Sequence, residues 1–335
     1  MTVNLPHTGE RGISVVIPTC NRPTDVIKSI RSVLKNDYPN FEIIVIDQST
    51  DQRSRDAIRQ TFHRSGNLRY FHLDVRSSSA SRNEGWRTAI HDVVAFTDDD
   101  AVVAVDWLKS IAQIFTQIHP APGLVGGPIE PVFETPRPAW LPQELDYLLP
   151  SFRLDSSIME FPESALPISV NLAASKRVLE EVGGFHPDLG LRIGSKYPFI
   201  GGEDSFLGMV VREKGYSIYY HPGMLVYHPV PRHRLNKIFF YHRNFREGVT
   251  TIELEHVRGE LNRGRMWGHI RWHLARMMKL ALEYPHVLLT GGRGKSSTSA
   301  LQMARIAFSW GVVYWCQHLL RRESGVGPST GRIGP

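Results

Sequence analysis

The sequence predicts an α/β protein with a mostly parallel central sheet, helices on both faces of that sheet, and a helical C-terminal extension. Three observations support this fold class. Short apolar runs alternate with amphipathic stretches through the first half of the chain, in the order strand, helix, strand, helix. The apolar run at residues 93–96 leads into three consecutive carboxylates, Asp98, Asp99 and Asp100. Beyond residue 232 the short apolar runs stop, and long helical patterns take over.

The first half of the chain supplies four strands of this sheet. The predicted strands are residues 13–18, 41–47, 68–73 and 93–96. The first predicted helix starts at Thr24 and is ended by Tyr38-Pro39, because the residue before a proline disfavours helical geometry. The other predicted helices are residues 53–60, 81–90 and 106–118. Thr24 is expected to cap the first of these helices and Asp106 the last, because hydroxyl and carboxylate groups satisfy the free N–H groups at a helix start. Pro18 is expected to end the first strand.

The second half begins with a short strand at residues 123–127. Residues 128–167 are rich in proline, which excludes long helices and central strands and predicts a long ordered loop. Regular structure is expected to resume beyond this loop. The regular segment begins with residues 168–174. The predicted strands beyond it are residues 217–220 and 224–227, and the predicted helices are residues 176–182 and 205–214.

The charge of the chain is unevenly placed. The net charge is +6, but residues 232–295 alone hold 13 Lys/Arg and 5 Asp/Glu, an excess of 8 positive charges. Such a basic segment suits an anionic partner such as membrane lipid, nucleic acid or a phosphorylated substrate. The two cysteines lie far apart and no signal peptide is visible at the N-terminus, so a reducing cytoplasmic location is expected.

The three carboxylates at residues 98–100 are the first candidate site. Adjacent carboxylates repel one another, so a cation is expected to offset them, and a hard divalent ion that also holds phosphate oxygens is the natural candidate. The alternative is a solvated turn that precedes the helix near Asp106. Further motifs along the chain favour the ion site.

From about Ile13 to His228 the sequence resembles the GT-A-fold glycosyltransferases of family 2. The resemblance depends on several motifs in the expected order, and Tyr227-His228 closes the series. The other motifs are Ile17-Pro-Thr-Cys-Asn-Arg22, Val45-Ile-Asp-Gln-Ser-Thr-Asp51, Ala80-Ser-Arg-Asn-Glu-Gly85, Phe96-Thr-Asp-Asp-Asp100, Val182-Gly-Gly-Phe185 and Gly202-Glu-Asp204. Members of this family transfer a sugar from a nucleotide diphosphate, and the type that this chain resembles inverts the anomeric centre.

The resemblance implies a donor site at the ends of the first strands. Asp47 is expected to accept the imide N–H of a uracil-like base, and the family often has a second Asp where this chain has Gln48. Pro18 and Thr19 are expected to touch the base or ribose. Two arginines, Arg22 and Arg82, are expected to hold the nucleotide or its diphosphate. Asp47 as a turn cap and Arg82 in a surface salt bridge are the alternatives.

The resemblance also implies a metal site for Mg²⁺ or Mn²⁺. Asp98 is expected to bind the ribose or the ion, Asp99 to bind or support the donor sugar, and Asp100 to bind the ion. His228 is expected to complete this site. The alternative for His228 is an ordinary hydrogen-bonded surface group.

Asp204 matches the position of the family's catalytic base, and Glu203 and Gly202 are expected on the acceptor side. The alternative is that Asp204 only caps its helix. We expect the chain to consist of an N-terminal tail, the GT-A domain implied by the resemblance, a basic helical extension and a second tail. Their expected bounds are 1–12, 13–232, 233–322 and 323–335, with a nucleotide-binding half at 13–127 and an acceptor half at 128–232.

The extension is expected to hold helices at residues 235–247, 266–283 and 298–320. In the second of these, basic residues alternate with Trp and Met, which is typical of a helix in an anionic membrane interface. The alternative is packing on the catalytic domain or an oligomer contact. The uncharged run at residues 306–316 is too short to span a bilayer. No recognition motif indicates a nucleic-acid partner.

The resemblance implies a metal-dependent inverting glycosyltransferase that uses a nucleotide sugar, and we expect UDP as the carrier. The expected acceptor is a saccharide or lipid-linked saccharide in polysaccharide or cell-envelope glycan synthesis. The expected location is the cytoplasm, with peripheral attachment to the cytoplasmic face of the membrane. Two alternatives remain open: a nucleotide-sugar-binding regulatory or scaffold protein, and a sugar nucleotidyltransferase, although residues 18–22 are not a glycine-rich phosphate loop.

Overall fold

The computed structural model describes residues 11–197, 200–285 and 297–324, and these residues form two compact units. The first, called the α/β unit, comprises residues 11–132, 150–197 and 203–230. The second, called the helical unit, comprises residues 133–149, 200–202, 231–285 and 297–324. The predicted basic extension lies in the helical unit, together with part of the proline-rich segment.

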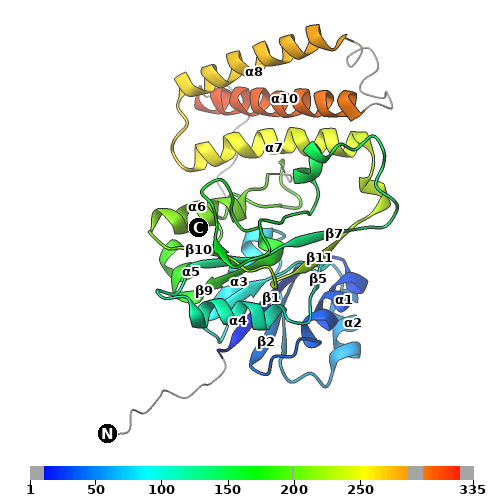
Figure 1. The fold of residues 1–335 in the computed structure, drawn as a ribbon, viewed down its shortest axis with the longest axis vertical. Helices are drawn as coiled ribbons and strands as arrows, with labels where there is room; N and C mark the ends of the chain where they lie inside the picture. Colours follow the sequence, from blue (N-terminus) through cyan, green and yellow to red (C-terminus); the bar gives the residue numbers. More distant parts are fainter. Residues whose placement is uncertain (1–10, 198–199, 286–296, 325–335) are drawn as a thin grey trace. The chain divides into compact units, whose positions relative to one another are not determined.

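The α/β unit is built on an eight-stranded sheet (Figure 1). Its strands lie in the order β3 (Leu68–His72), β2 (Phe41–Asp47), β1 (Ile13–Thr19), β4 (Val93–Phe96), β9 (Leu172–Ser175), β6 (Leu124–Gly126), β10 (Ile218–Tyr220) and β8 (Met159–Glu160). The strands from β3 to β4 are parallel, whereas β9 runs antiparallel to both β4 and β6. A second, three-stranded sheet has the order β5 (Val102–Val103), β11 (Val226–Val230), β7 (Ile129–Phe133).

Alternating apolar side chains place helices on both faces of the large sheet. Val15 and Val45 belong to one core cluster, and Val16 and Ile44 belong to the other, as the period of two in a strand requires. The first cluster takes side chains from α1 (Pro23–Leu34), α2 (Arg53–Phe62) and α4 (Trp107–Gln117). The second takes them from α3 (Ser78–Thr88), α5 (Lys176–Val182) and α6 (Glu203–Glu213). The predicted fold class is confirmed.

Neither predicted helix cap is confirmed as a side-chain cap. The first helix begins at Pro23 with Arg22 at its N-cap, because proline favours the first helical position, so Thr24 is not the cap. Asp106 is at the N-cap of α4 but makes no capping hydrogen bond through its side chain. The regular segment expected at 168–174 consists of a 3₁₀ turn, η2 (Ser169–Asn171), followed by β9.

Pro18 does not end the first strand, which continues through Thr19. The carbonyl of Val16 accepts the N–H of Thr97 on the β4 side, so residue 18 faces the same side two residues later. The pairing with β4 stops at Val16 and Phe96, and the missing N–H of Pro18 therefore costs no ladder hydrogen bond. The proline-rich segment contributes β7 and β8, both at sheet edges, which confirms the predicted absence of a central strand there.

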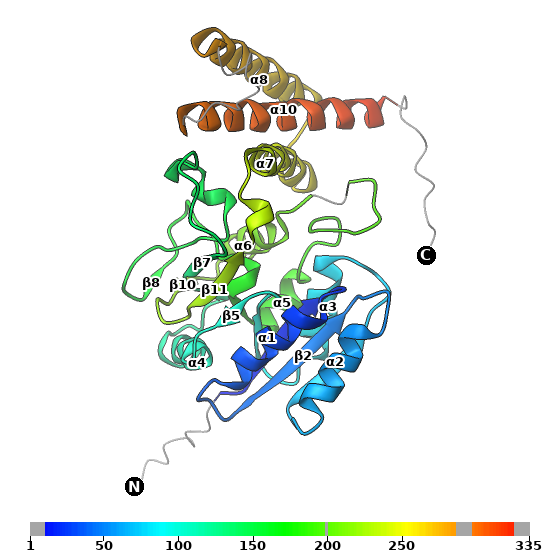
Figure 2. The same ribbon diagram turned by 90° about the vertical axis from the view of Figure 1, so that its right-hand side faces the viewer.

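The helical unit contains α7 (Lys237–Val257), α8 (Arg263–Glu283) and α10 (Ser297–Glu323), and α10 packs against both of the others (Figure 2). A short 3₁₀ turn, η1 (Gln143–Leu148), lies against α7, and η3 (Arg232–Arg234) precedes it. The helix predicted at 235–247 begins two residues before α7 does and ends ten residues too early. The side chain of Asn236 caps the start of α7, and Asn262 caps the start of α8. Among the described helices, none has the length and apolar character that a membrane span needs.

Two glycines let α7 and α10 cross closely. A Cβ atom built on Gly311 would lie 2.1 Å from the carbonyl oxygen of Phe245, and one on Gly248 would lie 2.2 Å from that of Phe308. Real Cβ atoms do not approach backbone so closely, so each position requires glycine. The described part of the proposed tails is limited to residues 11–12 and 323–324; the rest lies outside the described residues.

Candidate functional site

The carboxyl ends of β1 and β4 bring the first group of site residues together. Asp99 follows β4, and its Oδ2 accepts a hydrogen bond of 2.7 Å from the hydroxyl of Thr19 at the end of β1. Arg22, just beyond β1, donates from Nη1 to Asp99 at 3.1 Å and to Asp100 at 2.8 Å. Arg22 thus offsets part of the negative charge of the three carboxylates, for which a divalent ion was the cation expected from the sequence.

Asp99 is the most buried of the three carboxylates. Burial raises the pKa of Asp99 to about 7, although Arg22 and the Thr19 hydroxyl act in the opposite direction. Its two oxygens are bonded to Thr19 and Arg22. The geometry is therefore that of a supporting carboxylate, and the direct contact of Asp99 with a donor sugar stays a prediction.

Arg82 forms the second group. It lies on α3, its side chain is 5% exposed, and its guanidinium bridges two carboxylates: Nη2 to Asp98 at 2.8 Å and Nη1 to Glu203 at 3.0 Å. The hydroxyl of Ser78 also donates to Glu203, at 3.1 Å. Burial and the neighbouring Asp204 raise the pKa of Glu203, which Arg82 lowers. Arg82 is thus in a buried ion pair and not in the surface salt bridge that was the alternative.

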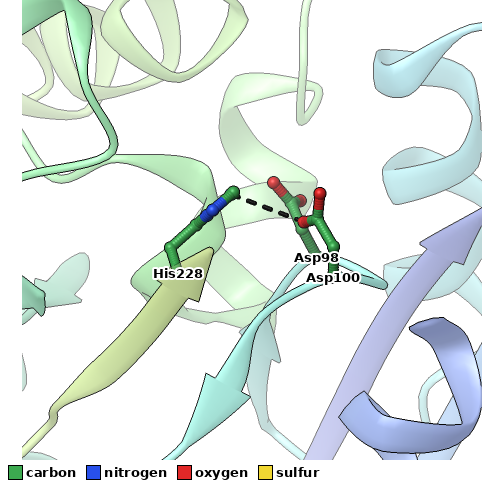
Figure 3. A group of neighbouring side chains, drawn as sticks. All are labelled: Asp98, Asp100 and His228. Carbon is green, nitrogen blue, oxygen red and sulfur yellow. Dashed lines mark ion pairs between the residues drawn. The ribbon is translucent and has the colours of Figure 1, made fainter. Parts of the chain in front are cut away.

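The third group is the candidate metal site. Asp98, Asp100 and His228 each offer one ligand atom, and these three atoms lie within 4.8 Å of one another (Figure 3). Nε2 of His228 is 3.4 Å from Oδ1 of Asp100. Its Nδ1 lies 3.1 Å from the carbonyl oxygen of Pro229, an outer-shell contact of the kind that orients metal-binding histidines.

The small sheet explains how His228 reaches the carboxylates. β5 begins two residues after Asp100, and β11 pairs with it antiparallel, with Tyr227 opposite Val102. The next residue along β11 is His228, which therefore comes level with the end of the carboxylate triplet. The structure thus brings together all three residues predicted as metal ligands.

Asp204 lies in the first turn of α6. Its Oδ1 accepts the N–H of Ser205 at 2.8 Å, and its Oδ2 accepts the N–H of Ser169 at 3.1 Å. The carboxylate is half-buried and braces η2 against α6. Its contact with Ser169 had no signal in the sequence, because the two residues meet only through the fold. The role of Asp204 as a base stays a prediction.

Asp47 ends β2 and is fully buried. Its Oδ1 accepts the N–H of Ser49 at 2.8 Å, and its Oδ2 accepts the hydroxyl of Tyr70 at 2.9 Å. Gln48 donates from Nε2 to the carbonyls of Val75 and Ser77, the latter at 3.0 Å. An aspartate at position 48 could not donate, so glutamine here holds the loop that leads into α3. Contacts of Asp47, Pro18 and Thr19 with a base or ribose stay predictions.

Two of the sequence motifs bind each other directly. Asn83 donates from Nδ2 to the carbonyl of Phe185 at 2.7 Å and accepts the N–H of Phe185 on Oδ1 at 2.9 Å. A Cβ on Gly184, whose φ is +75°, would lie 2.5 Å from that Oδ1. Gly202 has a φ of +88° and belongs to the helical unit, where a Cβ would contact Thr250 and Leu254. Its place on the acceptor side stays a prediction.

Known proteins match this chain over its first half and, in one case, over nearly its whole length. A family model described as Glycosyl transferase family 2 matches residues 14–183, which is 170 of 335 residues. The glycosyltransferase AglE of Haloferax volcanii is 26% identical over 333 residues, and the match covers 95% of both chains. A glucosyl-dolichyl phosphate glucuronosyltransferase of the same organism is 26% identical over 55% of this chain and 59% of its own length. An uncharacterised glycosyltransferase of Rickettsia felis is 39% identical over 98 residues, but the match spans only 16% of that protein.

Among solved structures, the mannosyltransferase PcManGT from Pyrobaculum calidifontis, in complex with GDP-Man and Mn²⁺, superposes with a TM-score of 0.57 at 18% identity. The superposition covers 95% of this chain and 88% of that one. At this level of identity the likeness shows a shared fold, the GT-A fold. The family model matches more than half of the residues of this chain. This chain therefore belongs to glycosyl transferase family 2 and is a glycosyltransferase.

Proposed function

We propose that this glycosyltransferase is a metal-dependent inverting enzyme that transfers a sugar from a nucleotide-diphosphate sugar, with UDP as the carrier, to a saccharide or lipid-linked saccharide. The product would serve polysaccharide or cell-envelope glycan synthesis. The observation that carries this proposal is the meeting of Asp98, Asp100 and His228, whose ligand atoms lie within 4.8 Å at the end of β4.

The donor set fits a divalent cation. Two carboxylates and one imidazole would supply three ligands, and diphosphate oxygens of the donor would supply others, which is how Mg²⁺ and Mn²⁺ are usually held beside phosphates. When bound, the ion would offset the charge that develops on the departing nucleoside diphosphate. The relative from Pyrobaculum calidifontis was solved with Mn²⁺, which supports Mn²⁺ as the first ion to test.

The donor would lie across the ends of β1, β2 and β4. Asp47, Pro18 and Thr19 line this edge, and Arg22 and Arg82 bring two guanidinium groups to it. The same relative holds GDP-Man, so GDP is the alternative carrier.

Asp204 would act as the base. In an inverting displacement the acceptor oxygen forms a bond to the anomeric carbon while the bond from that carbon to the diphosphate breaks. The acceptor's proton passes to the carboxylate, and the electron pair of the broken bond leaves with the nucleoside diphosphate. Glu203 is less suited to this role, because it is buried and bound to Arg82 and Ser78. Asp204 is half-buried and can be reached by an acceptor.

The acceptor class is supported by the relative whose name specifies a glucosyl-dolichyl phosphate, a lipid-linked sugar. A lipid-linked acceptor would place the enzyme at a membrane, on the cytoplasmic face, as a peripheral protein. The basic balance of residues 232–295 supports an anionic surface as the partner.

Donor hydrolysis in the presence of Mn²⁺ or Mg²⁺, measured with a panel of UDP and GDP sugars, tests the proposal. Asp100→Asn should abolish both the metal requirement and the activity. Asp204→Asn should bind donor normally and lose transfer by about 100- to 10,000-fold, the usual contribution of a general base. Wild-type rates for Asp204→Asn would remove the base assignment. Nucleotide-sugar binding without any turnover by the wild type would favour the regulatory alternative, and pyrophosphate release would favour a nucleotidyltransferase.

A further inference from the structure

The side of α8 that faces away from α10 carries large apolar side chains. Trp267, Leu274, Met278 and Leu282 are between 42% and 80% exposed. Together with Arg271 they recur every three or four residues, so they form one stripe along the helix, called here the α8 stripe. The buried series of this helix is a different one: Met266, Ile270, His273 and Leu280. The α8 stripe is therefore not the core face of the helical unit.

A groove runs along another side of the same helix. It has a volume of about 710 Å³, and its lining includes Trp272, Arg276, Lys279, Leu280 and Glu283 of α8 and Arg305 of α10. The guanidinium of Arg276 lies 5.2 Å from the ring centre of Trp272. Three cations face one carboxylate, which is 3.7 Å from Lys279. The groove thus combines apolar walls with an excess of positive charge.

Charge decides what can cover these surfaces. α8 contains five Lys or Arg residues and a single acidic residue, Glu283. A second copy of the chain would bring one positively charged helix against another, with Arg271 in the middle of both stripes, and like charges in contact oppose association. An anionic bilayer complements both surfaces, because its acyl chains can bury the α8 stripe and its lipid phosphates can pair with the cations of the groove.

We propose that α8 docks the enzyme on an anionic phospholipid bilayer. The α8 stripe enters the boundary between head groups and acyl chains, and the groove cations hold lipid phosphates. The helix lies along the surface: its basic residues occur from Arg263 to Lys279, throughout its length, and they would have to leave water if it crossed the bilayer. Arg271, within the stripe, extends its charged end toward the head groups while its stem stays apolar.

This proposal goes beyond the sugar-transfer chemistry and does not depend on the metal site or on Asp204. It adds a defined surface to the membrane partner expected for a lipid-linked acceptor. Bilayer binding and donor hydrolysis are separate measurements on the same protein. Failure of the docking proposal and failure of the proposed function can therefore be told apart.

The test is co-sedimentation of the full-length protein with vesicles of phosphatidylcholine alone and with vesicles in which about a third of the lipid is phosphatidylglycerol. The wild type should bind the anionic vesicles more tightly, and added salt should weaken this preference. Met278→Asp/Leu282→Asp, in the α8 stripe, should reduce binding to the anionic vesicles by at least about tenfold, because two apolar anchors are lost. Arg276→Gln/Arg305→Gln, in the groove, should lower the anionic preference by about fivefold for each cation removed.

Two matched controls lie outside the surface. Arg321→Gln removes an exposed cation from the end of α10, and Ile90→Asp replaces an exposed apolar residue of the α/β unit; both should bind vesicles as the wild type does. All variants should keep wild-type donor hydrolysis and helical content. Equal binding of the wild type to both vesicle types would overturn the proposal. So would wild-type binding by the stripe variant, or a wild-type dimer that the stripe substitutions dissociate without changing vesicle binding.

Discussion

The buried bridge made by Arg82 allows one prediction to be worked out in detail. Replacing Arg82 by Met keeps much of the side-chain volume but removes the cation between Asp98 and Glu203. At distances of 2.8 and 3.0 Å, each attraction amounts to about 5–6 kcal/mol before desolvation is subtracted. Removing one partner of a buried ion pair typically costs about 3–5 kcal/mol, because the remaining charges stay buried without compensation.

The loss should depend on pH. Burial already raises the pKa of Glu203 while Arg82 is present, and removal of the cation should raise that pKa further. Below the new value Glu203 is protonated and neutral, so the variant loses less stability there; above it the carboxylate is charged and the loss is larger. The stability that Arg82→Met loses relative to the wild type, measured as the decrease in the free energy of unfolding, should therefore become larger as pH rises. Adding Glu203→Gln should recover part of the loss and flatten this dependence.

The assay is urea denaturation of the metal-free protein, followed by tryptophan fluorescence, at several pH values. Arg87→Met is the matched control on the same helix, because Arg87 is exposed and only covers the ring of Trp86. It should cost at most about 1 kcal/mol. An unfolding free energy for Arg82→Met within about 0.5 kcal/mol of wild type, or a loss that does not change with pH, would refute the reasoning.

Three further predictions concern packing and buried polar groups. Gly311→Ala should destabilise the helical unit by about 1–3 kcal/mol in thermal unfolding, because the added Cβ would meet backbone of α7. The control Gly268→Ala, whose Cβ would have no atom within 4 Å, should be neutral or slightly stabilising. Equal effects of the two substitutions would contradict the close crossing of α7 and α10. Asn83→Leu should lower the free energy of unfolding in urea by about 2–4 kcal/mol, since the backbone N–H and carbonyl of Phe185 lose their hydrogen bonds. An unchanged urea midpoint would show that these two groups find other partners. Burial lowers the pKa of His273 from 6.5 to about 4, so the stability that this neutral side chain contributes is present above pH 6.5 and is lost as pH falls toward 4. His273→Phe should remove this part of the acid sensitivity in melts followed by circular dichroism. A variant with the same pH profile of melting temperature as the wild type would exclude the assignment.

The strands and most helices could be predicted from the sequence because their signals are local. The runs at residues 41–47 and 93–96 are bounded by charge, and a period of two decides which of their side chains face each cluster. Signals for boundaries were weaker. The predicted helix at 235–247 ends ten residues before α7 does, because a glycine such as Gly248 is typical of a helix end, whereas here it lies within α7 where that helix crosses α10 closely.

The sequence by itself determined which residues carry charge at strand ends and in which order the family motifs follow, since both depend only on neighbours along the chain. Only the tertiary structure decided how those charges are shared. Arg22 is bound to Asp99 and Asp100. Arg82 joins Asp98 to Glu203, which lies 121 residues after Arg82 in the chain. Pairing of β11 with β5 sets His228 beside the carboxylates. These contacts depend on the order and register of the strands. Many weak interactions along the whole chain together set that order and register, so no single residue indicates them in the sequence.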